Sequence, residues 1–251
     1  MGTTKTENLK KLMLLNKEVP ITTKKLNRMG ISSFLARKYK ENGWIESLGV
    51  GAFKFPQAKI SLEGTLHALQ FDMSINLHAG AKTALEMVGI RQFYREKERI
   101  YLFADKKVIL PLWVKNCQWD RDIQFIQSSK WNHKKFLFNP NTREFEFFIA
   151  SRELAIIQQI ELINRKESFD ETAQLFEMLN SLDPELVNEV LENASIKTKR
   201  IFSFLTDFYN HPWKKELSPG IIASGSSVIT IEKGGKFLKD YNLVIPGGFN
   251  V

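Results

Sequence analysis

Two short helices joined by a glycine turn are predicted near the start of this chain, and they constrain its fold more than any other feature. Thr22 or Thr23 can cap the first of these helices, and Gly30 is placed to close it in the left-handed conformation. Ser32 or Ser33 can then start the second helix. This arrangement is typical of a helix-turn-helix.

A longer helix is expected before this pair, and a hairpin after it. Residues 5–16 carry apolar side chains at helical spacing, and Pro20 favours an extended connection. Apolar residues alternate around the glycines at 49–51, which predicts a β-hairpin over 44–55. Three helices followed by a hairpin make a winged helix-turn-helix, which we assign to residues 1–58.

Positive charge is concentrated in this predicted module. Residues 1–60 hold twelve lysines and arginines against four acidic residues, and this excess equals the formal charge of +8 of the whole chain. Charge placed in this way indicates a nucleic-acid partner. The sequence shows no signal-peptide pattern and no apolar run of membrane-spanning length, so we expect a cytoplasmic protein that does not contact a membrane.

The second short helix is expected to contact DNA. At 100° per residue, Leu35, Tyr39 and Asn42 fall on one side, which we expect to be buried. The opposite side is expected to enter the major groove, where Arg37 and Lys40 suit guanine edges or phosphates. The expected DNA-binding residues are Ser32, Ser33, Phe34, Arg37, Lys38, Lys40 and, in the hairpin, Lys54.

These basic residues also have other interpretations. Lys38 and Lys54 suit phosphate contacts, which position a protein without reading sequence. Any exposed helix can carry lysine and arginine as a solvated face, and winged helices also dock other proteins. Because the charge extends over both short helices, the first helix and the hairpin, we favour nucleic-acid binding.

The rest of the chain is expected to form a mixed α/β body, which makes the whole fold α+β. Residues 59–165 are predicted to be an α/β middle region, and residues 166–251 to be helical and then β. Asp170, Asp183 and Ser195 are candidate helix caps in the last region. The predicted strands lie at 99–103, 108–114, 123–127, 145–149, 227–232 and 242–245, with a helix over 151–163 and a glycine turn at 233–236.

No group of residues indicates catalysis. The four histidines lack metal-ligand spacing, and the segment 224–227 lacks the ending of a phosphate-binding loop. Cys117 follows an apolar run and is expected to be a small buried hydrophobe. We therefore expect no enzymatic activity, no metal and no cofactor.

A second basic cluster consists of Lys197, Lys199 and Arg200. It lies at the expected start of a helix, where the helix dipole disfavours cations. This conflict suggests a binding role, although a salt-bridged surface is the better interpretation from charge alone.

A series of short motifs, in order along nearly the whole chain, resembles one known family. The motifs lie at 31–46, 49–53, 78–86 (His-Ala-Gly-Ala-Lys-Thr-Ala-Leu-Glu), 110–113 (Leu-Pro-Leu-Trp), 197–202, 211–213 (His-Pro-Trp) and 233–235. They resemble the AbiEi-type antitoxins of bacterial type IV toxin–antitoxin systems. None of these motifs is catalytic; the resemblance comes from their order.

This resemblance implies a repressor of its own operon, with double-stranded operator DNA upstream of its gene as the partner. It also implies an antagonist of a nucleotidyltransferase-like toxin encoded nearby, which such antitoxins generally counteract without a stable complex. The family links antitoxicity to the C-terminal domain, so Lys197, Lys199 and Arg200 are expected to form an antitoxicity surface.

Three other functions stay open at this point. The first is a winged-helix regulator unrelated to a toxin, with the body as a ligand or protein interaction module. The others are an enzyme acting on nucleic acid and an RNA-binding antitoxin. The oligomeric state is open too, because two DNA half-sites need two copies, which either a dimer or cooperative monomers can supply.

Overall fold

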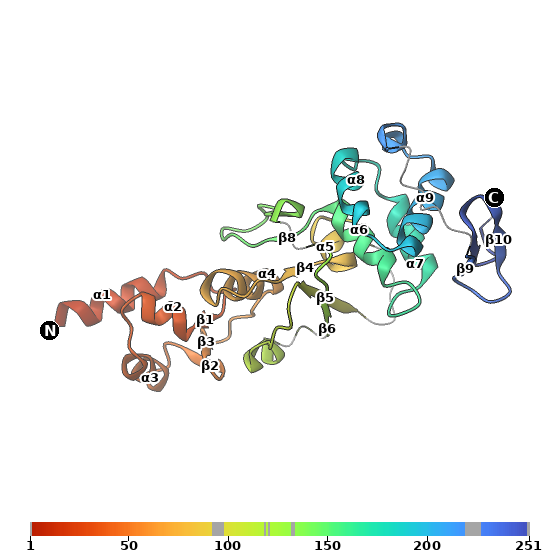
Figure 1. Cartoon of the computed structure of the whole chain (residues 1–251). Helices are drawn as coiled ribbons and strands as arrows, with labels where there is room; N and C mark the ends of the chain where they lie inside the picture. Colours follow the sequence, from red (N-terminus) through yellow and green to blue (C-terminus); the bar gives the residue numbers. More distant parts are fainter. Residues whose placement is uncertain are drawn as a thin grey trace. The chain divides into compact units, whose positions relative to one another are not determined.

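The structure is a computed structural model, and it describes residues 2–91, 98–117, 119, 121–131, 134–218 and 227–249. His133 and most of the segment 224–227 lie outside the described residues. The fold is mixed α and β and divides into two compact units (Figure 1). Unit 1 comprises residues 1–77, 106–121 and 139–148, and unit 2 comprises residues 78–105, 122–138 and 149–251.

Unit 1 begins with three helices and a small antiparallel sheet. The elements are α1 (Gly2–Met13), β1 (Ile21–Thr22), α2 (Thr23–Arg28), α3 (Ser33–Glu41), β2 (Glu46–Gly49) and β3 (Ala52–Lys54). β1 and β2 both pair with β3, so the sheet order is β1-β3-β2. The helices and the hairpin follow one another in the order that the sequence predicts.

Local residues determine where α2 and α3 begin and where the turn between them lies. The hydroxyl oxygens of Thr22 and Ser32 accept hydrogen bonds from the backbone amides of Lys25 and Leu35. Gly30 has a φ of +77°, a conformation in which a side chain would be strained. The predicted caps and the predicted glycine turn are therefore confirmed.

An apolar core holds the three helices against the sheet. Tyr39 is buried as predicted and Leu35 packs half-buried against the core, but Asn42 is exposed. The prediction for Asn42 is wrong because α3 ends at Glu41; the second buried residue of α3, besides Tyr39, is Ala36. The buried residues of this core are Leu12, Ile21, Leu26, Ile31, Ala36, Tyr39, Ile45 and Phe55.

Later parts of unit 1 include α4 (Leu62–His67), which continues into the π-helical turn η1 (Ala68–Asp72), and the 3₁₀ helix η2 (Leu112–Cys117). The strand predicted over 108–114 is wrong. Pro111 has no backbone N–H to donate to a sheet. The helix η2 follows it, and three residues of this helix are buried: Trp113, Val114 and Cys117. Burial raises the pKa of the Cys117 thiol to about 11, as expected for a small buried hydrophobe.

The strand predicted over 145–149 is also wrong for its first four residues. The amide nitrogen of the Gln70 side chain donates to the carbonyl of Phe148, and its oxygen accepts from the Phe148 amide, each at 2.8 Å. His67 Nδ1 lies 2.7 Å from the carbonyl oxygen of Glu146. Side chains of α4 and η1 thus take the backbone groups that a neighbouring strand would have paired.

Unit 2 contains a five-stranded mixed sheet in the order β6-β5-β4-β8-β7. Its strands are β4 (His78–Ala79), β5 (Arg99–Ala104), β6 (Asp122–Gln127), β7 (Leu137–Phe138) and β8 (Ile149–Ala150). β5 and β6 are parallel, and parallel neighbours need a long crossover between them. Residues 105–121 make this crossover, and nearly all of them belong to unit 1.

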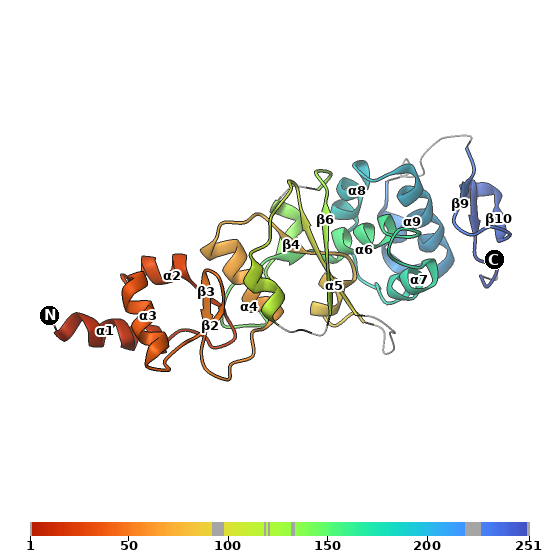
Figure 2. The same ribbon diagram turned by 90° about the horizontal axis from the view of Figure 1, so that it is seen from below.

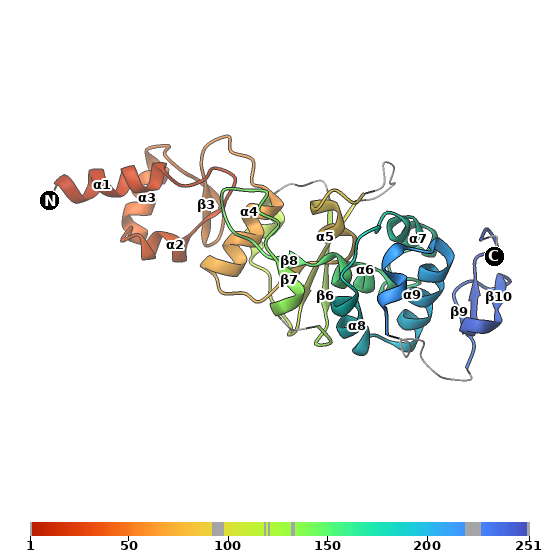
Figure 3. The ribbon, with the colours of Figure 1, turned by 90° about the horizontal axis from the view of Figure 1, so that it is seen from above.

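Helix α6 (Arg152–Glu161) is the central helix of unit 2. It contacts α5 (Ala81–Met87), α7 (Phe169–Glu177), α8 (Pro184–Glu192) and α9 (Ile196–Tyr209). Figures 2 and 3 show α6 between α5 on one side and the other three helices on the other. The stretch Glu153 to Ile160 is wholly buried, as expected for a helix surrounded by protein.

The predicted helix caps of unit 2 are confirmed with one exception. Asp183 and Ser195 cap α8 and α9, but Ser168 rather than Asp170 caps α7. Asp170 lies inside the first turn of α7, where a carboxylate still favours the helix dipole.

The chain ends in a three-stranded sheet made of β9 (Ile229–Thr230), β10 (Lys236–Leu238) and β11 (Leu243–Ile245). β9 and β10 flank the predicted glycine turn, but both pair with β11 rather than with each other.

A buried ion pair joins α5 to the segment before α7. Lys82 Nζ lies 2.8 Å from Oε1 of Glu167, and the two side chains are only 3% and 0% exposed. Glu167 also accepts hydrogen bonds from the Tyr101 hydroxyl and, at 3.2 Å, from Gln159. Burial alone would raise the pKa of Glu167, but the hydrogen bonds from Lys82 and Tyr101 and the charge of Lys82 outweigh it and lower the pKa.

We expect Glu167→Gln to lower the free energy of unfolding by about 3 to 5 kcal/mol, because it leaves the Lys82 ammonium buried without a counter-charge. In the wild type, the contribution of Glu167 should be complete above the unfolded pKa of about 4.3 and be lost as the pH falls through the lower folded pKa. Urea titrations at several pH values measure both effects. Glu192→Gln, which changes an exposed carboxylate, is the control; equal stability of the two variants would contradict the expectation.

Candidate nucleic-acid interface

The outer face of α3 carries six of the seven side chains predicted to bind DNA. All six are exposed: Ser32, Ser33, Phe34, Arg37, Lys38 and Lys40. The Lys38 ammonium lies 4.7 Å from the centre of the Phe34 ring, within the range of a cation–π interaction. Among the described residues, no carboxylate forms an ion pair with Arg37, Lys38 or Lys40. Within that part of the chain, the helix therefore presents three cations that form no ion pair.

The seventh residue, Lys54, is held inside the hairpin. Its ammonium lies 2.9 Å from a carboxylate oxygen of Glu46 and donates to the carbonyl of Ala58 at 3.1 Å. The Lys54 side chain is only 26% exposed. A phosphate contact by Lys54 would require this ion pair to open.

The hairpin is braced by η2. The side-chain nitrogen Nδ2 of Asn116 donates to the backbone carbonyl of Leu48 at 2.6 Å. A Cβ placed on Gly49 would lie 2.9 Å from Cβ of Trp113 and 3.0 Å from its Cα, closer than packed atoms tolerate. Position 49 therefore needs glycine, because Trp113 of η2 packs directly against the backbone of the hairpin and leaves no room for a Cβ atom.

The carboxylate of Asp72 connects η1 to α2, the helix that precedes α3. Asp72 is 5% exposed, and it accepts a hydrogen bond from Arg28 and lies 3.9 Å from Lys25 Nζ. The sequence gives no local signal for this contact, because Arg28 and Asp72 lie 44 residues apart. Two cations of α2, Lys25 and Arg28, are thus paired with a carboxylate inside unit 1, in contrast to those of α3.

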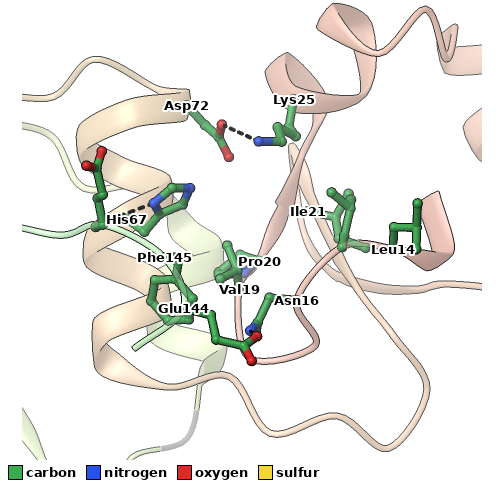
Figure 4. A pocket seen from close by; sticks show the side chains of 12 residues that line it. Leu14, Asn16, Val19, Pro20, Ile21, Lys25, His67, Asp72, Glu144 and Phe145 are labelled. Atoms are coloured by element: carbon green, nitrogen blue, oxygen red, sulfur yellow. Dashed lines mark hydrogen bonds and ion pairs between the residues drawn. The ribbon is translucent and has the colours of Figure 1, made fainter. Parts of the chain in front are cut away.

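A cavity of about 330 Å³ lies in unit 1 beside this contact. Figure 4 shows Lys25 facing Asp72 at one edge of the cavity and Asn16 beside Glu144 at another. Its walls combine the connection before α2 with α4 and η1. The lining residues are Leu14, Leu15, Asn16, Val19, Pro20, Ile21, Lys25, His67, Asp72, Glu144, Phe145 and Glu146.

The second basic cluster needs correction, because Arg200 does not lie on a surface. Arg200 is 1% exposed, and its guanidinium donates to the carbonyls of Ser227 at 2.6 Å and Asn242 at 3.4 Å. It therefore ties α9 to the segments that form the last sheet. An antitoxicity surface made of Lys197, Lys199 and Arg200 together is not available for contact with a partner.

The two lysines of this cluster bind the ends of other helices. Lys197 Nζ donates to the carbonyl of Ile163 at 2.9 Å, just after α6, and Lys199 Nζ donates to the carbonyl of Glu192 at 3.2 Å, at the end of α8. Cations are favoured at helix C-termini, and these contacts offset the unfavourable position of the two lysines at the start of α9. Burial lowers the pKa of Lys197.

The histidines of the described chain serve packing. His78 is buried, lies 3.1 Å from the side-chain amide of Gln158, and has its pKa lowered to about 4 by burial. His211 lies 3.0 Å from the carbonyl of Phe176, and burial lowers its pKa as well. Within the described residues, no group of histidine, cysteine and acidic side chains could hold a metal ion. No helix in that part of the chain has both the length and the apolar character to cross a bilayer.

Two family models match the chain over nearly its whole length. Residues 5–95 match the model described as "Transcriptional regulator, AbiEi antitoxin N-terminal domain", and residues 97–246 match "Transcriptional regulator, AbiEi antitoxin, Type IV TA system". The chain is also similar to the crystal structure of the RV2827C protein from Mycobacterium tuberculosis, with a TM-score of 0.61, 15% sequence identity and coverage of 97% of this chain and 91% of that one. This likeness shows a shared fold. No curated protein sequence matches the chain.

We expect Asp72→Asn to lower the free energy of unfolding by roughly 1 to 3 kcal/mol, because a buried carboxylate loses its charge-assisted hydrogen bond to Arg28. Hydrogen exchange at the backbone amides of α2 should also be faster in this variant than in the wild type. Glu7→Gln breaks an exposed ion pair with Lys11 and should leave both measurements unchanged. Unaltered exchange in α2 of the Asp72 variant would show that this carboxylate does not hold the helix.

Proposed function

Because this chain belongs to the AbiEi antitoxin family of transcriptional regulators of type IV toxin–antitoxin systems, we propose that it represses its own operon and counteracts a nucleotidyltransferase-like toxin. The N-terminal unit acts as a winged helix on double-stranded operator DNA upstream of its gene, in the cytoplasm. The observation that carries this proposal is the set of three cations on the exposed face of α3 that form no ion pair with any described residue. The proposal involves no reaction and no cofactor.

The dimensions and chemistry of α3 suit the major groove. An α-helix with its side chains is about 10 to 12 Å in diameter, which matches the width of about 12 Å of the major groove. The N-terminal residues of a recognition helix contact base edges, which places Ser33 and Phe34 deepest. Arg37 follows one turn later with a guanidinium that can bind a guanine edge, and Lys38 and Lys40 reach phosphates.

Ser32 has a positioning role in this proposal. Its hydroxyl oxygen caps α3 by accepting from the Leu35 amide at 3.3 Å, and its hydroxyl hydrogen can still be donated to a phosphate. Lys54 contributes through the ion pair with Glu46, which keeps the hairpin closed, or through phosphate once that pair opens. The α3 residues therefore supply most of the proposed contact.

We expect Arg37→Ala/Lys40→Ala to weaken binding to the DNA upstream of the gene by about one to two orders of magnitude near 150 mM salt, since one base contact and one phosphate contact are lost. The slope of log K against log salt should become shallower by about one to two. Fluorescence anisotropy over a salt series measures both quantities. Lys233→Ala/Lys239→Ala removes equal charge from exposed positions of unit 2 and should bind like the wild type. If both double variants weakened DNA binding equally, the effect would come from net charge alone, and α3 would not be the contact surface.

We assign toxin protection to unit 2, which holds most of the C-terminal family domain, so repression and toxin protection should be separable. With the toxin and this chain expressed from unrelated inducible promoters, Arg37→Ala/Lys40→Ala should protect growth as well as the wild type, because unit 2 is unchanged. The same variant should fail to repress a reporter driven by the native promoter. Loss of growth protection at equal protein level would contradict the assignment of protection to unit 2.

A further inference from the structure

Phe34 is a large apolar side chain placed on the outer face of α3. It is 67% exposed, whereas Tyr39 of the same helix is 6% exposed and Leu35 packs half-buried against the core. Burial of a phenylalanine side chain stabilises a fold, and the exposed ring of Phe34 contributes little in this way. Folding therefore does not account for an aromatic residue at this position.

The surroundings of Phe34 indicate what it contacts. It lies in the first turn of α3, and residues three and four positions later on a helix share its face. These residues are Arg37 and Lys38, and the Lys38 ammonium lies over the Phe34 ring at 4.7 Å. An apolar ring among cations that form no ion pair with any described residue is complementary to a polyanion that also presents an apolar group. Duplex DNA has both, since the C5-methyl of thymine projects into the major groove between the phosphate backbones.

We infer that Phe34 contacts the C5-methyl group of a thymine in the major groove and thereby sets part of the sequence preference of the operator. This inference rests on the proposed function, in which α3 enters that groove. RNA is the poorer partner for this face, because the major groove of an A-form helix is too narrow for a helix to read. A protein partner would have to supply both an apolar socket and acidic groups for three adjacent cations.

The inference is tested with two forms of the same DNA. The fragment upstream of the gene is amplified once with thymidine and once with deoxyuridine nucleotides, so that the two products differ only in their C5-methyl groups. We expect the wild-type chain to bind the uracil form about fourfold more weakly for each methyl contacted, the effect of losing one buried methyl-sized group. Phe34→Ala should bind both forms with the same affinity, close to that of the wild type for the uracil form.

Two further variants serve as controls. Phe34→Leu keeps an apolar side chain and should retain part of the preference for thymine. Val228→Ala changes a 51% exposed apolar residue of unit 2 and should retain all of it. Thermal unfolding of each variant, expected at the wild-type temperature because both positions are exposed, shows that the fold is intact.

Each outcome has one meaning. A thymine preference that Phe34→Ala abolishes supports the inference. Equal binding of both DNA forms by the wild type, or an equal preference in Phe34→Ala, overturns it and leaves DNA binding in place. Failure of the wild type to bind this DNA selectively overturns the proposed function itself.

Discussion

The parallel pairing of β5 with β6 determines the course of the chain between these strands and, through it, the support of the N-terminal hairpin. Six residue pairs join these strands, from Arg99 and Asp122 to Ala104 and Gln127, and strands that run in the same direction cannot be joined by a tight turn. The crossover that they require carries η2, and η2 holds the hairpin of unit 1 through Asn116 and Trp113. The support of the N-terminal hairpin is therefore encoded more than 60 residues after the hairpin itself.

The elements that could be predicted are those controlled by neighbours in sequence. Thr22, Ser32, Asp183 and Ser195 cap helices through amides two or three residues later, and Gly30 closes its turn alone. These interactions lie within one turn of the chain, so a sequence pattern contains all the information they need.

Distant partners decided the wrong strand at 145–149 and the details of the site, whereas the strand predicted at 108–114 fails at Pro111, which has no amide to donate. The backbone of Phe148 is bound by Gln70, 78 residues away, although its own segment has the apolar content of a strand. The excess of cations in the first 60 residues could be counted from the sequence, but the sequence does not tell which of these cations form ion pairs. The structure separates Arg28, paired with Asp72, from Arg37 on the exposed face of α3, and only this separation points to one helix. The family resemblance was visible in the order of the motifs and is confirmed by the matching family models.

The two hydrogen bonds between the Gln70 side chain and the backbone of Phe148 have a consequence for how this fold can vary. One side chain makes the hydrogen bonds that a neighbouring strand would make, so the segment before Phe148 does not have to pair in register with another strand. Residues 141–144 are exposed, and the entropy of closing a loop rises only slowly with its length. Insertions should therefore be tolerated at 141–142, before the ion pairs of Arg143 with Glu18 and Glu63, and a fluorescent label could be attached there.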